Sequence, residues 1–352
     1  MTASESATDS ITDVPGIQVG HTTAARSGWR TGTTVVVAKA GAVAGVDVRG
    51  GGPGTRETDV LRPENLVHHV HAVCLTGGSA YGLAAADGVM SILESRRIGF
   101  PVGVDGTDVV PIVPTAVIYD LGRGGVFANR PDASFGARAV KAARDHAPAQ
   151  GTVGAGTGAM AGGLQGGVGT ASVTLPDGVV VGAIAVVNSA GSVIDATTGL
   201  PWEPRGHPLR RPSNSDRIRL REHFVSLRPP LNTTIGVVAT SASLGKPECL
   251  KFASVAQDGL ARAIRPAHSM FDGDTIFALS TGRDAVVAPL DGDQARARAV
   301  ALTPLFEAGA VVFALACTRA VLAAHSHPNG PPAYRDLCPT AYRTPVARGA
   351  SR

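Results

Sequence analysis

The chain has 352 residues, with 32 Lys and Arg against 28 Asp and Glu, so its formal net charge is +4. Hydrophobic residues make up 44 % and charged residues 17 %, yet no run of about 18 apolar residues lacks Gly, a charge or a hydroxyl, which argues against a transmembrane helix. We expect a soluble globular protein with no membrane partner, built as two domains or as one large α/β core.

Residues 1–10 are polar and mildly acidic, and they lack the basic and apolar regions of a secretory signal. We expect them to form a disordered tail. The chain has four scattered cysteines with no metal-binding spacing, which fits reduced thiols in a cytoplasmic protein. These are Cys74, Cys249, Cys317 and Cys338.

Apolar runs bounded by Gly or Pro predict a series of β-strands. In chain order these runs cover residues 33–38, 43–48, 71–75, 109–118, 169–174, 179–187, 234–240 and 275–280. The turn Pro176-Asp177-Gly178 connects two of them directly, which favours antiparallel pairing.

Four further segments predict helices, and in the third of them the apolar residues fall on one face. They cover residues 79–95, 135–147, 247–265 and 294–324, and the last could form one helix or two. Because several strands follow one another without an intervening helix, the pattern favours a layered α/β sandwich over a doubly wound sheet.

The excess positive charge lies in one segment, residues 201–232, which holds seven arginines and three acidic residues. A nucleic-acid groove usually pairs basic residues with stacking aromatic rings, and this segment offers only Trp202 and Phe224. We therefore expect a solvated connecting loop and no nucleic-acid partner. Residues 325–352 contain five prolines, which predict a second tail, rich in Pro and Arg.

Two motifs that could bind a cofactor or a metal lack the required context. Residues 154–159 match the GxGxxA pattern, but a helix is expected before them and a Gly-rich loop after them, whereas a dinucleotide site needs a strand and then a helix. His68, His69 and His71 lie close together, but no nearby Asp, Glu or Cys completes a set of metal ligands. We expect neither a metal nor an organic cofactor.

The junction between Asn232 and Thr233 is the most informative position in the sequence. A long polar, Pro-rich connection ends at Asn232, and Thr233 opens a strand that we expect to be buried. Cleavage of this peptide bond would give Thr233 a free α-amine, with a reference pKa of about 7.7–8.0, beside its own hydroxyl, so one residue would supply both nucleophile and base. The residues alone leave a second interpretation open, in which Asn-Thr only ends a loop and begins a strand.

Two carboxylates bracket a glycine farther along the chain. Asp272 and Asp274 lie between a predicted helix and a predicted strand, where both could point into one site. The same tripeptide recurs at 291–293, where Asp293 is well placed to cap the next helix, so the motif could equally be a turn. Ser269 is a rival nucleophile, but it lies in a loop and does not itself open a strand.

Six motifs, taken together and in order, resemble the P1 peptidase family, which includes the endo-type nylon-oligomer hydrolases and the β-aminopeptidase/D-aminopeptidase group. They begin at Gly50, Leu75, Pro114, Val186, Asn232 and Arg265 and read GGGPGTRETD, LTGGSAYGL, PTAVIYDLG, VVNSAG, NTTIGVVAT and RPAHSMFDGDTIFALSTG. The resemblance implies an α-β-β-α sandwich similar to N-terminal nucleophile hydrolases, with a single catalytic domain over residues 11–324. It also implies self-cleavage into an α chain that ends at Asn232 and a β chain that begins with the nucleophile, Thr233.

The resemblance also implies roles for the other site residues. Asn188 matches a side-chain amide that stabilises the oxyanion, a task for which a neutral donor in a dry pocket is suited. Tyr119 matches a pocket tyrosine that donates a hydrogen bond to the substrate or leaving group. Asp272 and Asp274 match two polar or acidic positions that orient the nucleophile and its amine.

One position departs from the family pattern. Members commonly carry a lysine in the Gly-rich stretch before the next strand, and Gln165 stands about where that lysine would fall. Without the ammonium, self-cleavage and turnover could be slow, unless the Thr233 amine and Asn188 suffice.

The expected activity is hydrolysis of linear amides, such as nylon or 6-aminohexanoate oligomers or short peptides. The resemblance implies a homo-oligomer of processed αβ protomers that acts on a small amide or peptide without a cofactor. Two alternatives stay open. One is acyl transfer to an amine, as in the ornithine acetyltransferases, which have a similar sandwich, and the other is a non-catalytic scaffold.

Overall fold

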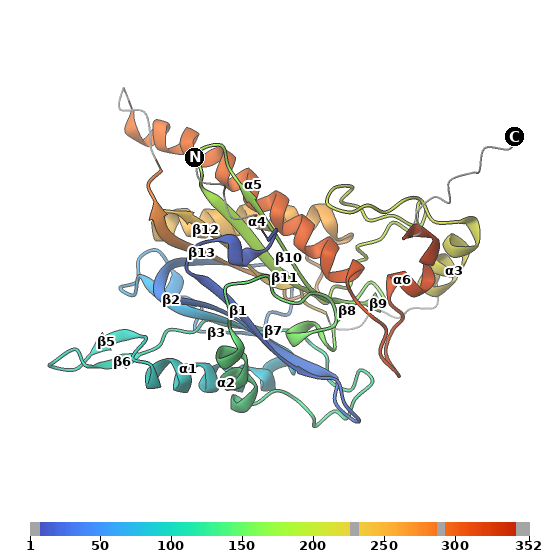
Figure 1. The fold of residues 1–352 in the computed structure, drawn as a ribbon, viewed down its shortest axis with the longest axis horizontal. Coiled ribbons are helices and arrows are strands. Elements are labelled where there is room, and N and C mark those ends of the chain that lie inside the picture. Colours follow the sequence, from blue (N-terminus) through green and yellow to red (C-terminus); the bar gives the residue numbers. More distant parts are fainter. Residues whose placement is uncertain (1–7, 226–231, 287–292, 343–352) are drawn as a thin grey trace, which may run out of the picture.

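One nine-stranded β-sheet forms two stacked layers at the centre of the molecule, which are called the two sheets below, and helices cover the outer face of each layer (Figure 1). The computed structural model describes residues 8–225, 232–286 and 293–342. From one side to the other, the layers are helix, sheet, sheet and helix. The α-β-β-α sandwich expected from the sequence is thus confirmed.

Strand β2 (Thr31–Val48) runs through both sheets and joins them. Its first half pairs with β1 (Ile17–Ala24) and β4 (His69–Thr76), and its second half pairs with β13 (Thr275–Asp284). Beyond β4 the order continues to β7 (Thr115–Val117) and β3 (Thr55–Arg56). Beyond β13 it continues to β12 (Ile235–Ala242), β11 (Val180–Val187) and β10 (Gly167–Thr174).

Two pairs of helices form the outer layers (Figure 1). The first pair is α1 (Ala85–Ser95) and α2 (Ala133–Ala142), and the second is α4 (Lys246–Ala263) and α5 (Gln294–Leu322). Smaller elements are α3 (Asn214–Val225), α6 (Tyr334–Leu337), the hairpin strands β5 (Phe100–Val102), β6 (Asp108–Val110), β8 (Met160–Ala161) and β9 (Leu164–Gln165), and five 3₁₀ turns at Ile11–Asp13, Asp59–Leu61, Ser79–Ala84, Gly154–Gly156 and Pro339–Ala341.

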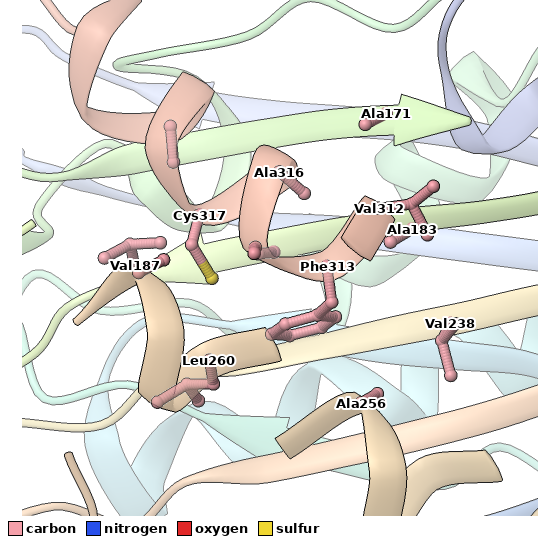
Figure 2. Close-up of a cluster of buried hydrophobic side chains, with 14 of the residues drawn as sticks. Ala171, Ala183, Val187, Val238, Ala256, Leu260, Val312, Phe313, Ala316 and Cys317 are labelled. Atoms are coloured by element: carbon pink, nitrogen blue, oxygen red, sulfur yellow. The ribbon is translucent and has the colours of Figure 1, made fainter. Parts of the chain in front are cut away.

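Alternation along the strands separates the core into three apolar layers. Successive side chains of a strand point to opposite faces of the sheet. In β2, Val36 packs between the sheets, whereas Val35 packs against α1 and α2. In β12, Val237 packs between the sheets and Val238 belongs to the layer under α4 and α5, which Figure 2 shows together with Phe313 of α5. Strands covered on both faces are therefore apolar at consecutive positions, as the sequence indicated.

The predicted strands are present, with two differences. Residues 33–38 and 43–48 belong to one strand, β2, whose ladder to β4 is irregular between Val37 and Ala42. Residues 109–118 are split between β6 and β7, because Pro111 and Pro114 lack the N–H that a continuous ladder needs. The predicted turn does join β10 and β11 as an antiparallel pair.

The segment over residues 201–232 is not only a solvated loop, because α3 lies inside it. Leu220 of this helix is fully buried, and the buried Asp216 accepts hydrogen bonds from Thr340 and pairs with Arg219. The helix was missed because most of its residues are charged or polar, so its apolar pattern is weak. Residues 226–231 lie outside the described part of the chain.

Both expected tails are packed where the structure describes them. At the amino end, Ser10 is buried and Asp9 pairs with Arg319 at 2.6 Å. At the carboxyl end, Tyr334 is fully buried and its hydroxyl donates to the Gly199 carbonyl at 2.6 Å, so the segment up to residue 342 is part of the globule despite its prolines. Residues 1–7 and 343–352 lie outside the described residues.

The last predicted helix is one continuous element, α5, with Pro304 inside it. Its length and apolar composition would allow it to cross a membrane, although the sequence contains no uninterrupted apolar run. From Leu302 onward its inward side chains are buried against α4 and the second sheet. Asp293 caps its amino end, as predicted, by accepting hydrogen bonds from the amides of residues 295 and 296.

Candidate active site

Three strand ends meet at one end of the second sheet, which is the layer formed by β10, β11, β12 and β13. Asn188 directly follows β11, Thr233 lies two residues before β12, and Asp274 directly precedes β13. Because β11 and β12 are antiparallel, the end of one lies beside the start of the other, and because β12 and β13 are parallel, their starts lie side by side. The ladder therefore brings these three residues together although they are far apart in the sequence.

Thr233 is buried, with 5 % of its surface exposed. Its amide nitrogen donates a hydrogen bond to the main-chain carbonyl of Asn188 at 2.5 Å. Its hydroxyl donates a hydrogen bond to the carbonyl oxygen of Asn232, the residue before it. The Thr233 hydroxyl oxygen thus lies against the carbonyl group that self-cleavage would have to attack.

The side-chain amide of Asn188 has a defined orientation. Its Oδ1 accepts hydrogen bonds from Nη1 of Arg123 at 2.5 Å and from the amide nitrogen of Met160 at 3.0 Å. The side chain is fully buried, and no acceptor within the described residues lies at hydrogen-bond distance from its Nδ2. Since a buried amide N–H₂ normally has a partner, this donor can still bind one more acceptor.

Asp274 binds the backbone next to Thr233. Its Oδ1 accepts a hydrogen bond from the amide nitrogen of Thr234 at 2.7 Å, and its Oδ2 lies 2.8 Å from Nδ1 of His268. Burial raises the pKa of the Asp274 carboxyl, and the neighbouring Asp272 adds to this rise, whereas the bonds from His268 and Thr234 oppose it. His268 was not among the predicted site residues, although it lies in one of the motifs that carry the resemblance.

Asp272 connects two loops of the site. Its Oδ1 accepts a hydrogen bond from the amide of Ala190 at 3.0 Å, and its Oδ2 accepts from the Ser269 amide at 3.1 Å and the Ser269 hydroxyl at 2.5 Å. Ser269, the rival nucleophile, therefore serves as a hydrogen-bond donor to Asp272. Asp272 and Asp274 therefore both lie in the site. The hydrogen bonds that their carboxylate oxygens accept come from residues near Thr233.

Tyr119 and Thr233 line the same cavity, which has a volume of about 190 Å³. Its other walls come from the Gly-rich loop before β3, the 3₁₀ turn Ser79–Ala84, strand β7, the residue before Thr233 and the loop before Asp272. These residues are Gly52, Pro53, Gly54, Ser79, Ala80, Val117, Asn232, Met270 and Phe271. Met270 and Phe271 are largely exposed at the same time, so the cavity has an apolar wall that a substrate chain can reach from solvent.

The Gly-rich turn after Tyr119 contributes a residue that the sequence interpretation missed, Arg123. Its Nη1 donates to Oδ1 of Asn188 and its Nη2 donates to Oδ1 of Asn232 at 3.1 Å, so one guanidinium links these two side chains. Its Cζ lies 5.4 Å from the centre of the Tyr119 ring. The sequence offered one weak signal for Arg123, namely its position shortly after Tyr119 in the turn that follows β7.

Gln165 is fully buried and has a structural partner. Its Oε1 accepts a hydrogen bond from Nη2 of Arg30, and its Nε2 donates to the carbonyls of Ala159 and Gly166 at 2.9 and 3.1 Å. The missing lysine does not leave the site without a positive charge, because the guanidinium of Arg123 bonds to Asn188 and Asn232. The effect of Gln165 on the rate of self-cleavage stays a prediction.

The motifs that the sequence interpretation set aside have other roles. Residues 154–156 form a 3₁₀ turn that packs against β2, with no strand before it and no helix after it to bind a dinucleotide. The ring nitrogen Nδ1 of His71 accepts a hydrogen bond from the amide of Ile112 at 3.2 Å. Within the described ranges, no group of three His, Cys, Asp or Glu side chains is arranged to hold a metal ion.

The chain is similar in sequence to known proteins over most of its length. The model of the family described as Peptidase family S58 matches residues 9–330. An uncharacterized aminopeptidase from Mycobacterium leprae is 50 % identical over 362 aligned positions, which cover 97 % of both chains. A 6-aminohexanoate-oligomer endohydrolase from Paenarthrobacter ureafaciens is 32 % identical, over 81 % of this chain and 78 % of the relative.

Solved structures support the same fold. A β-aminopeptidase from a Burkholderia species superposes with a TM-score of 0.70 at 23 % identity, and the match covers 96 % of each chain. An L-aminopeptidase D-Ala-esterase/amidase from Ochrobactrum anthropi, described as a variant of the Ntn hydrolase fold, superposes with a TM-score of 0.65 at 20 % identity, over 92 % of this chain and 88 % of that one.

Proposed function

The chain belongs to peptidase family S58 and is a hydrolase of peptide or amide bonds, and on this premise we propose that it cleaves itself between Asn232 and Thr233 and then uses the new amino-terminal threonine as its nucleophile. The observation that carries the proposal is the contact between the Thr233 hydroxyl and the Asn232 carbonyl oxygen. We further propose that the P1 resemblance of the motifs and the S58 match describe the same group of enzymes.

Self-cleavage proceeds as an acyl shift followed by hydrolysis. The Thr233 oxygen attacks the carbonyl carbon of Asn232, the C–N bond breaks, and the nitrogen takes up a proton to become the α-amine of Thr233. Water then adds to the ester and releases a carboxylate on Asn232 and the Thr233 hydroxyl. Thr233, now the first residue of the β chain, thereby gains an α-amine. The reference pKa of this group is about 7.7–8.0, which suits a base at neutral pH.

Turnover repeats the same chemistry on a substrate amide. The α-amine takes the proton of the Thr233 hydroxyl as the oxygen attacks, and it returns this proton to the leaving amine. The Nδ2 group of Asn188 donates to the oxyanion, a kind of stabilisation that is worth about 10²–10³ in rate for one donor. Tyr119, on the cavity wall, donates to the substrate or leaving group, and Asp272 and Asp274 hold the surrounding backbone in place.

The substrates we propose are linear amides, either 6-aminohexanoate oligomers or short peptides. The support comes from the partly apolar cavity beside Thr233 and from the names of the relatives. We also propose that residues 11–324 form one catalytic domain shared by both chains, and that processed αβ protomers assemble into a homo-oligomer in the cytoplasm.

Denaturing electrophoresis of purified full-length protein tests the mechanism. We expect the 35.7 kDa chain to give two fragments, the smaller beginning Thr-Thr-Ile-Gly on amino-terminal sequencing, and the Thr233→Ala variant to stay whole. Wild-type and variant proteins are then incubated with linear 6-aminohexanoate trimer and with alanine p-nitroanilide. An intact wild-type chain that still hydrolyses either compound, or a variant that keeps the activity, would refute the proposal.

A further inference from the structure

We infer that Arg123 is the positioning residue of this site, which fixes the Asn188 amide so that its N–H₂ faces the reacting carbonyl in both self-cleavage and turnover. The inference rests on the proposed function and concerns a residue outside the predicted set. The observation behind it is that one guanidinium bonds to Asn188 and Asn232 at once, at 2.5 and 3.1 Å.

The orientation of Asn188 depends on what surrounds its oxygen. A primary amide has one acceptor end and one donor end, and the two ends have nearly the same shape. In this site both surrounding groups are donors, Nη1 of Arg123 and the amide of Met160, so the oxygen must face them. The donor end then points the other way, where it is buried without a partner among the described residues.

Removal of Arg123 would weaken this preference. One neutral donor, the Met160 amide, would remain to hold Oδ1, whereas hydrogen bonds from charged donors are about twice as strong as neutral ones. The amide could then rotate or turn over, and the Nδ2 group would no longer be held for the oxyanion. Preorganisation of such a donor is what gives it catalytic value.

Arg123 is itself held from behind by a second arginine. Nη1 of Arg30 donates to the Arg123 carbonyl at 2.9 Å, while Nη2 of Arg30 donates to Gln165. Arg30 is 3 % exposed, and the segment after α5 covers it, since the backbone of Gly330 lies against its guanidinium. The carboxyl-terminal segment that was expected to be a tail therefore supports the turn that carries Arg123.

The charge of Arg123 persists at the pH where such an enzyme works. Burial lowers the pKa of its guanidinium to about 10, and the nearby Asp120 carboxylate opposes this fall. The pKa of Asp120 is raised to about 6 by its own burial, so this residue too is largely ionised at neutral pH. Around neutral pH the Asn188 oxygen is consequently held by a cation.

The test follows self-cleavage of the full chain over time on denaturing gels, for wild type, Arg123→Ala and Arg123→Lys. We expect Arg123→Ala to process at least about tenfold more slowly, a smaller loss than the roughly 10²–10³ for removal of an oxyanion donor itself. Arg123→Lys should be slow as well, because a single ammonium cannot reproduce a planar fork that bonds two amides. Arg138→Ala, in the exposed part of α2, is the matched control and should process like wild type.

Chemical rescue separates positioning from a structural role. Guanidinium chloride at a low, non-denaturing concentration should speed up processing of Arg123→Ala several-fold over the same concentration of sodium chloride. It should not speed up the double variant with Asn188→Ala, and that double variant should be no slower than Asn188→Ala alone, because residues that act through one group are not additive. Thermal melts check that every variant is folded.

The outcomes separate the inference from the proposed function. A wild type that never cleaves at Asn232 overturns the proposed function itself. A wild type that cleaves, with a folded Arg123→Ala or Arg123→Lys that cleaves equally fast, overturns only the role of Arg123. Multiplicative losses in the double variant would also overturn it, because Arg123 would then act independently of Asn188. If Arg123→Ala does not fold, the folded Lys variant decides.

Discussion

The main-chain carbonyl of Asn188 accepts a hydrogen bond from the amide nitrogen of Thr233 at 2.5 Å. The backbone of Asn188 thus holds Thr233, the proposed nucleophile, while its side chain carries the Nδ2 donor, which has no partner among the residues that the structure describes. A side-chain substitution at this position leaves the backbone bond in place, so it can test the donor without displacing the nucleophile.

The Asn188→Asp variant should fold but process slowly. A carboxylate has nearly the same shape and keeps the acceptor contacts to Arg123 and Met160, yet it has no N–H₂ to donate and places a negative charge near the oxyanion. We expect self-cleavage to slow by at least about 10²-fold. A gel time course measures it, with the exposed Asn214→Asp as control. Processing at the wild-type rate would show that Asn188 is not the oxyanion donor.

We define the acid limit as the pH below which the rate of self-cleavage falls. This pH should be higher than the pKa of an ordinary Asp carboxyl group. Burial raises the pKa of Asp274, whose ionised form accepts hydrogen bonds from Thr234 and His268. As the pH falls, a carboxyl with a raised pKa takes up its proton earlier, so a rate that needs the ionised form is lost earlier. The rate is measured from about pH 4 to pH 8, the range around the reference values of Asp and His.

His268→Ala should move this limit to higher pH. The His268 bond lowers the pKa of Asp274, so its removal lets burial and the Asp272 charge raise the pKa further. The exposed His146→Ala is the control. An acid limit that stays in place, or moves to lower pH, would mean that Asp274 does not set it.

Ser269→Ala should keep self-cleavage while losing some stability. The Ser269 hydroxyl donates to the Asp272 carboxylate at 2.5 Å, and loss of a hydrogen bond to a charged group costs about 1.5–3 kcal/mol of unfolding free energy. Urea denaturation measures the cost, with the exposed Ser95→Ala as a comparison. If the Ala variant folds but neither processes nor hydrolyses amides, Ser269 has a chemical role and the assignment to Thr233 is wrong.

Gln165→Lys should destabilise the protein strongly and give no faster processing. It would remove the acceptor for Arg30 and place a second cation against a buried guanidinium, and an uncompensated buried charge costs about 3–5 kcal/mol. Thermal melts would show a large fall in Tm, whereas Gln294→Lys, at the exposed start of α5, should change little. A stable Lys variant that processes faster would contradict this prediction and show that the absence of the family's lysine slows processing in this protein.

Much of the site could be predicted from the sequence because it lies at strand ends. Asn188, Thr233 and Asp274 each adjoin an apolar run, and such runs are the most readable part of the chain. The motifs around these runs then carried the resemblance. Their assembly at one edge follows from the pairing of β11, β12 and β13.

Arg123 could not be predicted in the same way. It lies in a turn without periodic pattern, and its partner Asn188 is 65 residues farther along the chain. The carboxyl-terminal segment was misjudged for a related reason, since prolines indicate where helices and strands stop but not whether the chain between them is buried. Tyr334 there is fully buried, a long-range contact that no local pattern encodes.

Strands β12 and β13 of the carboxyl-terminal half are inserted between β11 and β2 of the amino-terminal half. With the proposed cut before Thr233, two separate polypeptides would share one ladder, and unfolding would change from a unimolecular to a bimolecular equilibrium. The precursor can refold alone at any dilution, but the mature form must find its complement again, so its Tm should rise with protein concentration. The proposed cleavage would therefore make the stability of the fold depend on protein concentration.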